Sequence, residues 1–339
     1  MDMPSRSIIL DRIEWIILHF IDQLTRNEKT LRLRSSLDPS SHQLIFNRRT
    51  SNKLSYNMKT LAQIYQLLLC DKRSTIRDLY YDHKSLYRKQ ETLNRSVTDV
   101  CELLNAQRRE LNLLSSSKGL IFGSLSFILT SSIDSVPIDC TRQPLLISEN
   151  LLIATPSSNS QFILVVEKDA TFQKLIDDHF HILYPQSILV TGKGYPDLVT
   201  RHLLRRLSRL LSIPIFGLFD ADPHGIEIFL TYKYGSDKSK VEGSGANVPT
   251  MRWLGLRPSE ARLLPLAHDQ LLTLEHSDYR KAVKVRRRAE ILNEREVVKE
   301  MDELRNVRYK MELEAVSSAG VSFLPRFYLV PRLKHLLQS

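Results

Sequence analysis

Hydrophobic residues in the first third of the chain recur at the spacing of amphipathic helices. Three segments show this pattern, at 8–24, 57–68 and 92–104, with apolar positions three or four residues apart. Another short helix is predicted to begin at Thr75, because Thr75 and Asp78 satisfy the S/T-x-x-D/E capping pattern. The sequence therefore predicts a mainly helical first domain.

Two short segments after these helices, Glu110–Leu114 and Leu120–Leu125, are predicted to be strands. The run SSSKG at 115–119 separates them, so we expect the two strands to form a β-hairpin. The helices at 57–68, after Thr75 and at 92–104, followed by this hairpin, have the order of a winged-helix domain, a helix-turn-helix variant that places its third helix in a DNA groove. Other small α+β domains share this order.

Apolar runs rich in β-branched residues alternate with amphipathic segments in the second half of the chain. Strands are predicted at Phe162–Val166, Ile188–Val190 and Ile213–Phe219, and helices at Ala170–Phe180 and Asp197–Leu211. This alternation indicates a mostly parallel sheet covered by helices. Functional groups of such sheets gather beyond the carboxyl ends of the strands, so the residues that follow each strand are the first candidates for a site.

Composition divides the chain into four parts. We expect an N-terminal helix and a basic arm at 1–56, the helical domain with its hairpin at 57–130, and a Ser-, Pro- and Thr-rich linker at 131–160. The α/β domain with a C-terminal helical extension is expected at 161–339. The arm is interpreted as a linker, either solvated or in contact with phosphates, and the charged stretch 278–314 as a solvated helical face.

Charge narrows the class of partner. The chain of 339 residues has 48 Lys and Arg against 38 Asp and Glu, a formal net charge of +10. Such an excess favours a polyanion, nucleic acid first and an anionic membrane second, although an ordinary basic protein remains an alternative. No run approaches a membrane span, and the start lacks a secretory signal. The three cysteines form neither a disulfide framework nor a zinc pattern, so we expect an intracellular protein.

Three acidic residues follow predicted strands. Glu167 comes directly after the first strand, and Asp220 and Asp222 follow the third. Side chains two apart on an extended chain point the same way, so the two aspartates can converge on one ion. A hard ion such as Mg²⁺ takes one or two protein carboxylates and bridges to substrate phosphates, and Glu167 would add a third ligand or an acid–base group. The alternative is that the aspartates only decorate a helix N-terminus.

A glycine-rich turn, TGKGYPD at 191–197, lies between these strands. Its backbone amides and Lys193 could approach a phosphate. The spacing is not that of a Walker loop, so no nucleotide hydrolysis site is predicted. A tight turn without a ligand is the alternative.

A tyrosine in the short helix after Thr75 is a candidate nucleophile. If the helix continues, Arg77 lies four residues before Tyr81 on the same face. A tyrosine hydroxyl needs a base or a nearby positive charge to attack at neutral pH, and a guanidinium there could bind a phosphate and stabilise the phenolate. Tyrosines in short helices are more often packing residues.

Five motifs occur together in one order: RDLYY at 77–81, KGLIFG at 118–123, VEK at 166–168, GKGYPD at 192–197 and DADPHG at 220–225. In this order they resemble the meiotic double-strand-break transesterase family (sporulation-eleven type), which comprises the eukaryotic homologues of the A component of topoisomerase VI. The GS at 235–236 and the ELEA at 312–315 also resemble later segments of that family. The likeness covers roughly residue 57 to the C-terminus.

The resemblance implies α/β and α+β domains: a winged-helix (catabolite-activator-like) DNA-binding domain that carries the catalytic tyrosine, then a Toprim domain with a mostly parallel sheet. It implies that the second tyrosine of the pair is the nucleophile, and that three acids hold Mg²⁺. It further implies DNA-backbone contacts and a tyrosine close to DNA. Carried over position by position, the catalytic residues are Tyr81, Arg77 and Glu167. The metal ligands are Glu167, Asp220 and Asp222. The residues at the DNA backbone are Arg77, Lys118 and Lys193, and Tyr195 lies near the DNA.

The same resemblance implies partners and a place of action. The family acts on double-stranded DNA as a homodimer, in which the tyrosine of one protomer meets the metal site of the other. It works with other break-formation proteins, among them one that resembles the B component of topoisomerase VI, on meiotic chromosomes in the nucleus. One departure is Ile76, which stands where a basic residue often precedes the arginine, and this weakens the case for a phosphate contact there.

The function expected from the sequence is a sequence-tolerant DNA transesterase that makes double-strand breaks through a 5′-phosphotyrosyl intermediate. One alternative is a DNA-binding scaffold of the same fold without catalysis. Another is the A component of a strand-passing type IIB topoisomerase, which would need an ATPase that this chain lacks.

Overall fold

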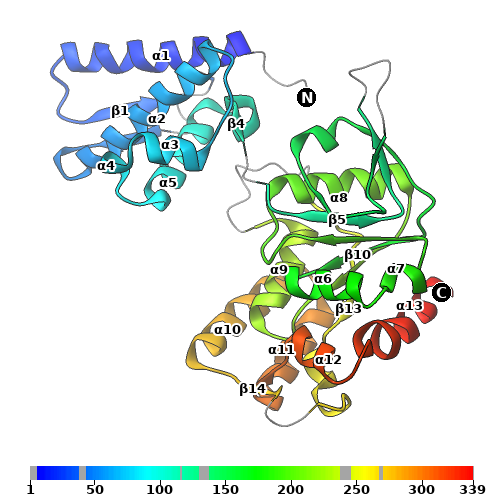
Figure 1. Cartoon of the computed structure of the whole chain (residues 1–339). Helices are drawn as coiled ribbons and strands as arrows, with labels where there is room; N and C mark the ends of the chain where they lie inside the picture. Colours follow the sequence, from blue (N-terminus) through cyan, green and yellow to red (C-terminus); the bar gives the residue numbers. More distant parts are fainter. Residues whose placement is uncertain are drawn as a thin grey trace. The chain divides into compact units, whose positions relative to one another are not determined.

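The computed structural model describes residues 6–37, 43–114, 117–129, 137–236, 246–266 and 270–338. The described residues form two compact units, one up to residue 114 and the other from residue 117 onward (Figure 1). This boundary lies before the second strand of the expected hairpin, and not at residue 130. Among the described residues, no helix has the length and apolar character needed to cross a membrane.

The first unit is mainly helical, as its hydrophobic periodicity predicts. Its core of apolar side chains is built by three long helices, which the structure places at α1 (Arg6–Thr25), α2 (Ser51–Leu69) and α5 (Gln90–Leu104). The shorter elements of this unit are η1 (Arg48–Thr50), α3 (Ile76–Asp82), α4 (Lys84–Tyr87) and η2 (Arg108–Leu111), and the short strands β1 (Leu31–Arg34), β2 (Gln43–Phe46), β3 (Ser74–Thr75) and β4 (Leu113–Leu114).

The basic arm expected near the N-terminus is folded over most of its described length, so its interpretation as a linker was wrong there. Strands β1 and β2 pair antiparallel, and Leu33, Leu44 and Phe46 are buried in the core of the first unit. The prediction failed because these apolar positions are few and lie among basic residues, so their alternation was hidden by the charge.

The expected hairpin is also corrected. Strand β4 pairs with β3 in parallel, whereas β5 (Leu120–Gly123) pairs antiparallel with β11 (Ser187–Thr191) in the other unit. The two predicted strands therefore belong to different units. Local sequence shows that both segments are apolar but cannot show which distant strand each one pairs with.

The second unit is built on a six-stranded sheet in the order β13-β12-β10-β11-β5-β8. Strands β10 (Phe162–Val166), β11, β12 (Ile215–Leu218) and β13 (Arg252–Gly255) run parallel, and β5 and β8 (Leu145–Leu146) complete the sheet with antiparallel pairs. Every residue of β10, β11 and β12 is buried, which is typical of a sheet covered on both faces. The mostly parallel sheet predicted from the sequence is confirmed.

Helices cover both faces of this sheet (Figure 1). One face packs against α8 (Leu198–Leu211), α9 (Pro223–Tyr234), α10 (His276–Ile291) and α11 (Arg295–Val307). The other packs against α6 (Asp169–Asp177), α7 (Phe180–Leu183), α12 (Leu313–Ser318), the π-helical η8 (Leu324–Leu329) and α13 (Val330–Gln338). The remaining elements of this unit are β6 (Ser126–Ile128), β7 (Ile138–Asp139), η3 (Glu149–Leu152), β9 (Thr155–Ser157), η6 (Pro258–Arg262), β14 (Leu272–Thr273) and β15 (Tyr309–Lys310).

Two further expectations differ from the structure. The described part of the expected linker, 137–160, contains three strands, of which β7 and β9 both pair with β6. The charged stretch 278–314 is divided between α10 and α11, and it continues into β15 and α12. One face of each helix in this stretch is buried, so the stretch is not simply a solvated surface. Parts of the predicted arm, hairpin turn and linker, at 38–42, 115–116 and 130–136, lie outside the described residues.

Candidate active site

The candidate nucleophile lies on the short helix α3 of the first unit. Thr75 caps this helix as predicted: its Oγ1 accepts from the Asp78 N–H at 3.1 Å, and the Thr75 N–H donates to the Asp78 carboxylate at 3.3 Å. These bonds satisfy backbone donors that a helix start leaves free. Leu79 on the opposite side is buried in the core, so the helix is fixed at its start and along one face.

Tyr81 is exposed, with 56% of its surface accessible, and Arg77 lies over its ring. The Arg77 Cζ is 5.8 Å from the Tyr81 ring centroid, which confirms the predicted i, i+4 contact. Tyr80 is turned differently, because its hydroxyl donates to the Arg88 carbonyl at 3.1 Å. Ile76 is partly buried against the core, so it leaves Arg77 as the exposed cation of the first turn. Of the two tyrosines, Tyr81 is the one with a hydroxyl free of bonds among the described residues.

The acidic candidates lie in the second unit, beyond the ends of β10 and β12. Glu167 follows β10 and Asp220 follows β12, and they are 6% and 1% exposed. The Asp220 backbone N–H donates to Glu167 Oε2 at 2.8 Å, which brings the two residues together. The Glu167 carbonyl accepts from the Gly194 N–H at 2.8 Å, so the glycine-rich turn is joined to the same position. Neighbouring parallel strands thus deliver these residues to one edge of the sheet.

Both oxygens of Asp220 have partners inside the protein. Its Oδ1 accepts from the Leu313 N–H at 2.8 Å, and its Oδ2 lies 2.9 Å from the Lys168 ammonium. The same ammonium also contacts Glu314 at 3.0 Å and Glu312 at 3.3 Å. Lys168 therefore balances three carboxylates that approach from two distant parts of the chain.

Asp222 has a structural task in addition to any role in metal binding. It is the N-cap of α9, and its Oδ1 accepts from the backbone N–H groups of His224 and Gly225. Gly225 leaves room for the acids: a Cβ there would lie 2.8 Å from Glu167 Oε2 and 2.4 Å from the Asp220 carbonyl. The helix N-terminus interpretation of the D-x-D pair is therefore confirmed at Asp222, and its metal role stays a prediction.

Burial sets the protonation of the two buried acids. Burial, reinforced by the negative charge of Asp220, raises the pKa of Glu167 to about 8. Burial also raises the pKa of Asp220 to about 7, although the Leu313 N–H and the Lys168 ammonium oppose this shift. Two acids forced together in a buried site favour a bound cation, because a cation offsets the cost of keeping both charged.

The predicted set of metal ligands is only partly assembled. Among the residues that the structure describes, no three His, Cys, Asp or Glu side chains are arranged as a ready cation site. The bonds above use both oxygens of Asp220, through Leu313 and Lys168, and one oxygen of Asp222, through the start of α9. A cation would therefore have to share or displace the Lys168 ammonium at Asp220.

The basic candidates of this unit gather around the glycine-rich turn. The Lys118 ammonium donates to the Lys193 carbonyl at 3.1 Å, and the Lys118 N–H donates to the Asp197 carboxylate at 2.9 Å. Lys193 has the left-handed φ of 52° and pairs with Asp169 at 2.9 Å. The positive charge of Lys193 is therefore partly balanced, whereas Lys118 remains exposed beside the turn.

Tyr195 at this turn is held by a charged pair that was not predicted from the sequence. Its hydroxyl donates to Glu227 of α9, and Lys281 of α10 pairs with the same carboxylate. The pKa of Glu227 is lowered, because the contacts with Lys281 and Tyr195 outweigh the effect of burial. No sequence motif joins these three residues, so only the fold could bring them together.

Lys168, Glu312 and Glu314 were not predicted as site residues either. Their motifs were noted in the sequence, VEK at 166–168 and ELEA at 312–315, but without a chemical role. The structure brings Glu167, Asp220, Asp222, Lys168 and the glycine-rich turn together in the second unit, and it places Arg77 and Tyr81 in the first.

Comparison with known proteins finds matches over most of the chain. Residues 162–333 match the family model of the Toprim domain shared by Spo11 and the A component of topoisomerase 6, and residues 52–113 match the model described as type IIB DNA topoisomerase. The chain is 42% identical to the meiotic recombination protein spo-11 of Caenorhabditis elegans over 98% of this chain and 77% of that protein. It is 36% identical to the human meiotic recombination protein SPO11 over 98% of this chain and 89% of the human protein. It is 31% identical to the A component of DNA topoisomerase 6 from Arabidopsis thaliana over 83% of this chain and 66% of that protein. The chain, whose second unit contains a Toprim domain, therefore belongs to the family formed by Spo11 meiotic recombination proteins and the A components of topoisomerase VI.

Proposed function

We propose that this chain is a topoisomerase-like transesterase that makes double-strand breaks in meiotic DNA to start homologous recombination. The observation that carries the proposal is the exposed Tyr81 with the Arg77 guanidinium over its ring, on a helix that is capped and packed. Membership of the family, in which the relatives above are named meiotic recombination proteins, supports the same function.

In the proposed step the Tyr81 hydroxyl oxygen attacks a backbone phosphorus of DNA. A bond forms between the tyrosine oxygen and phosphorus, and the bond between phosphorus and the 3′ oxygen breaks. The phenol proton leaves to solvent or a base, and the 3′ oxygen takes up a proton. The product is a 5′-phosphotyrosyl link and a free 3′-hydroxyl. Arg77 contributes positive charge where the phosphate accumulates negative charge.

The buried acids of the second unit are the proposed ligands of a divalent cation, which would have to share or displace the Lys168 ammonium at Asp220. Glu167 and Asp220 are joined through one hydrogen bond, both are buried, and their raised pKa values show that two negative charges are costly there without a cation. Glu167, Asp220 and Asp222 would hold Mg²⁺, which when bound supplies positive charge to the phosphate oxygens. Asp222 keeps Oδ2 available, because its bonds to the start of α9 use Oδ1.

The resemblance supplies the partners of this proposal. Two copies would act together on duplex DNA, each tyrosine working with the metal site of the other copy. A protein that resembles the B component of topoisomerase VI would join them on chromosomes in the nucleus. We also propose that the first unit is a winged-helix domain. Its helices support this assignment, although the expected hairpin is not formed by the predicted segments.

A second candidate is the A component of a strand-passing topoisomerase, since the chain also resembles that component of the plant DNA topoisomerase 6. Relaxation of supercoiled DNA that requires ATP and a partner protein would support this candidate. Breaks without strand passage would support the dedicated break-maker.

The function is tested in meiotic cells that lack their own copy of the protein. Wild type, Tyr81→Phe and the matched control Tyr80→Phe are expressed at equal levels, and double-strand breaks are counted. We expect breaks with wild type and none with Tyr81→Phe. We expect breaks with Tyr80→Phe as well, because the Tyr80 hydroxyl bonds to the backbone and is not the proposed nucleophile. Normal break numbers in Tyr81→Phe would leave the DNA-binding scaffold as the function.

A further inference from the structure

The exposed side of α10 carries three cations that have no partner among the described residues. Arg280, Lys284 and Arg287 are exposed, and their spacing of four and three residues places them on one face of the helix. Within the described part of the chain, none of the three forms an ion pair or a side-chain hydrogen bond. We call these three residues the α10 ridge.

The other cations of the same helix are used inside the protein. Lys281 pairs with Glu227, Arg286 binds Asp302 through two bonds of 2.7 and 3.1 Å, and Arg288 donates to the Gly235 carbonyl. The helix therefore separates its cations into a paired inner set and an unpaired outer set. A merely solvated charged face would mix acids with the ridge, but Asp278 of this helix is buried and Glu290 pairs with Arg286.

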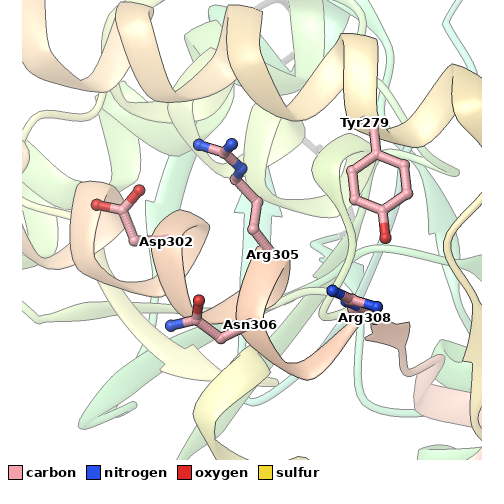
Figure 2. Close-up of a pocket in the computed structure, with 5 residues that line it drawn as sticks. All are labelled: Tyr279, Asp302, Arg305, Asn306 and Arg308. Atoms are coloured by element: carbon pink, nitrogen blue, oxygen red, sulfur yellow. The ribbon is translucent and has the colours of Figure 1, made fainter.

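A hollow of about 590 Å³ lies beside α10 and is lined by Tyr279, Asp302, Arg305, Asn306 and Arg308. Figure 2 shows Tyr279 of α10 facing Arg308 near the end of α11, with Arg305 between Tyr279 and Asp302 in the view. The acid in this hollow, Asp302, is bonded to Arg286, and Arg305 also interacts with its charge. The hollow thus presents two guanidinium groups, a phenol, an amide and one carboxylate, so its cations outnumber its acids.

Helix dipoles explain only part of this pattern. Arg305 and Arg308 stand at the C-terminal end of α11, where cations are favourable in any protein. Arg280 is the fifth residue of α10, beyond the first turn, so the helix dipole does not account for a cation there.

The hollow lies a short way along the chain from the segment that pairs with the backbone between the candidate aspartates. Two residues lie between Arg308 and Met311, and three steps along an extended chain span about 10 Å. The backbone of Met311 pairs with Ala221, which lies between Asp220 and Asp222. Lys310 in the same segment pairs with Asp278 of α10 at 2.9 Å. The first turn of α10 is therefore tied to the strand that reaches the acids.

We propose that the α10 ridge, together with Arg305 and Arg308, binds the phosphate backbone of duplex DNA as it leaves the cutting site. The inference rests on the proposed function, because DNA held at the acids would continue over this surface. From Arg280 to Arg287 the helix rises about 10 Å, and one DNA strand carries about three phosphates over that length of axis. Binding through phosphates is independent of sequence.

The test measures binding of a short fluorescent DNA duplex to the full-length chain carrying Tyr81→Phe, so that no cutting occurs. The ridge variant combines Arg280→Ser, Lys284→Ser and Arg287→Ser. The matched control combines Arg209→Ser, Arg295→Ser and Lys299→Ser, three exposed helical cations outside the ridge. Both variants lose three positive charges, and all six side chains are exposed, so we expect similar, small decreases in Tm, because serine favours a helix less than arginine or lysine does.

Affinity is measured across a series of salt concentrations. For the ridge variant we expect about tenfold or greater loss of affinity and a log–log salt slope less negative by about 2 to 3. The control is expected to bind nearly as the parent does. If the ridge variant binds DNA with wild-type affinity, the proposal is overturned. If the control loses as much affinity as the ridge variant, the proposal is also overturned, because the loss then follows from net charge.

A further arm measures retention on immobilised polyglutamate. If the ridge variant binds DNA normally but loses this retention, the surface serves an acidic protein and the DNA assignment is wrong. These outcomes are separate from the proposed function, because the binding assay needs no chemistry. If the ridge variant binds DNA with wild-type affinity, the proposed Tyr81 reaction is not affected. If the proposed function is wrong, Tyr81→Phe will make a normal number of breaks.

Discussion

The backbone N–H of Leu313 donates to Oδ1 of Asp220 at 2.8 Å and ties a candidate metal ligand to a segment 93 residues later in the chain. This contact fixes the direction of the carboxylate, while Lys168 holds the other oxygen at 2.9 Å. The Asp220 carboxylate is thus oriented before any cation binds, and this lowers the free-energy cost of organising the site.

Asp220→Asn is predicted to remove the negative charge of residue 220 and to keep its hydrogen bond with the Leu313 backbone. The amide oxygen can still accept from Leu313, so we expect folding to persist, whereas the lost charge should reduce Mg²⁺-dependent cutting by about 100-fold. Cutting of a DNA duplex is measured over a series of Mg²⁺ concentrations. Asp177→Asn, an exposed aspartate of α6, serves as the control, and equal Mg²⁺ dependence in both variants would remove Asp220 from the site.

Substitutions of Asp222 are predicted to divide its cap role from its metal role. Asp222→Ser keeps an N-cap acceptor, and Asp222→Ala removes it, so only the alanine variant should lose about 0.5–2 kcal/mol of unfolding free energy. Both variants lack the carboxylate, and both should lose cutting. Thermal unfolding and cutting are compared in one series. Full cutting by the serine variant would mean that Asp222 acts only as a helix cap.

Gly225→Ala is predicted to damage the acid site through space alone. The added Cβ would lie 2.8 Å from Glu167 Oε2 and 2.4 Å from the Asp220 carbonyl. We expect a loss of about 1–3 kcal/mol in unfolding free energy and a weaker response to Mg²⁺. Gly320→Ala is the control, because its Cβ would meet nothing closer than 3.9 Å. Equal stability of the two variants would contradict the described packing.

The stability of the metal-free protein is predicted to fall as pH rises from about 5 to 8. Burial raises the folded-state pKa of Glu167 from 4.5 to about 8, so the folded protein binds this proton more tightly than the unfolded chain does. Between those values the unfolded chain holds fewer protons, and the unfolding free energy therefore decreases with pH. We expect a Tm about 5 °C lower at pH 8 than at pH 5.5.

This pH effect is measured by thermal unfolding in EDTA and repeated with Mg²⁺. Mg²⁺ should raise Tm more at pH 8 than at pH 5.5, because the acids must be charged to bind it. Glu167→Gln should flatten the metal-free dependence. If the Tm of Glu167→Gln varies with pH as the wild-type Tm does, groups other than Glu167 cause the fall in Tm.

Local patterns predicted the elements of the site well. The Thr75–Asp78 capping pair marked the start of α3, and the four-residue spacing of Arg77 and Tyr81 correctly placed them in contact. The buried run Phe162–Val166 correctly indicated a parallel strand that ends directly before Glu167. Each of these features depends on neighbours within one turn or one strand, and local sequence therefore determines them.

Contacts between distant segments were not predicted. Strand β5 was expected to pair with its neighbour in sequence, but it joins β11 about 70 residues away, because burial in the larger sheet outweighs the local hairpin. Lys168 meets Glu314 across 146 residues, and Lys281 meets Glu227 across 54. The Lys168–Glu314 and Lys281–Glu227 pairs require the complete sheet and its helices, so no spacing rule in the sequence reveals them.

The central claim is that Tyr81 becomes covalently joined to DNA. The most direct measurement lyses meiotic cells that express tagged protein under fully denaturing conditions, purifies the protein, and asks whether DNA 5′ ends remain attached. The structure and the family together predict attachment in wild type and in Tyr80→Phe, and none in Tyr81→Phe. Attachment that persists in Tyr81→Phe, or is absent from expressed and chromatin-bound wild type, would contradict the account.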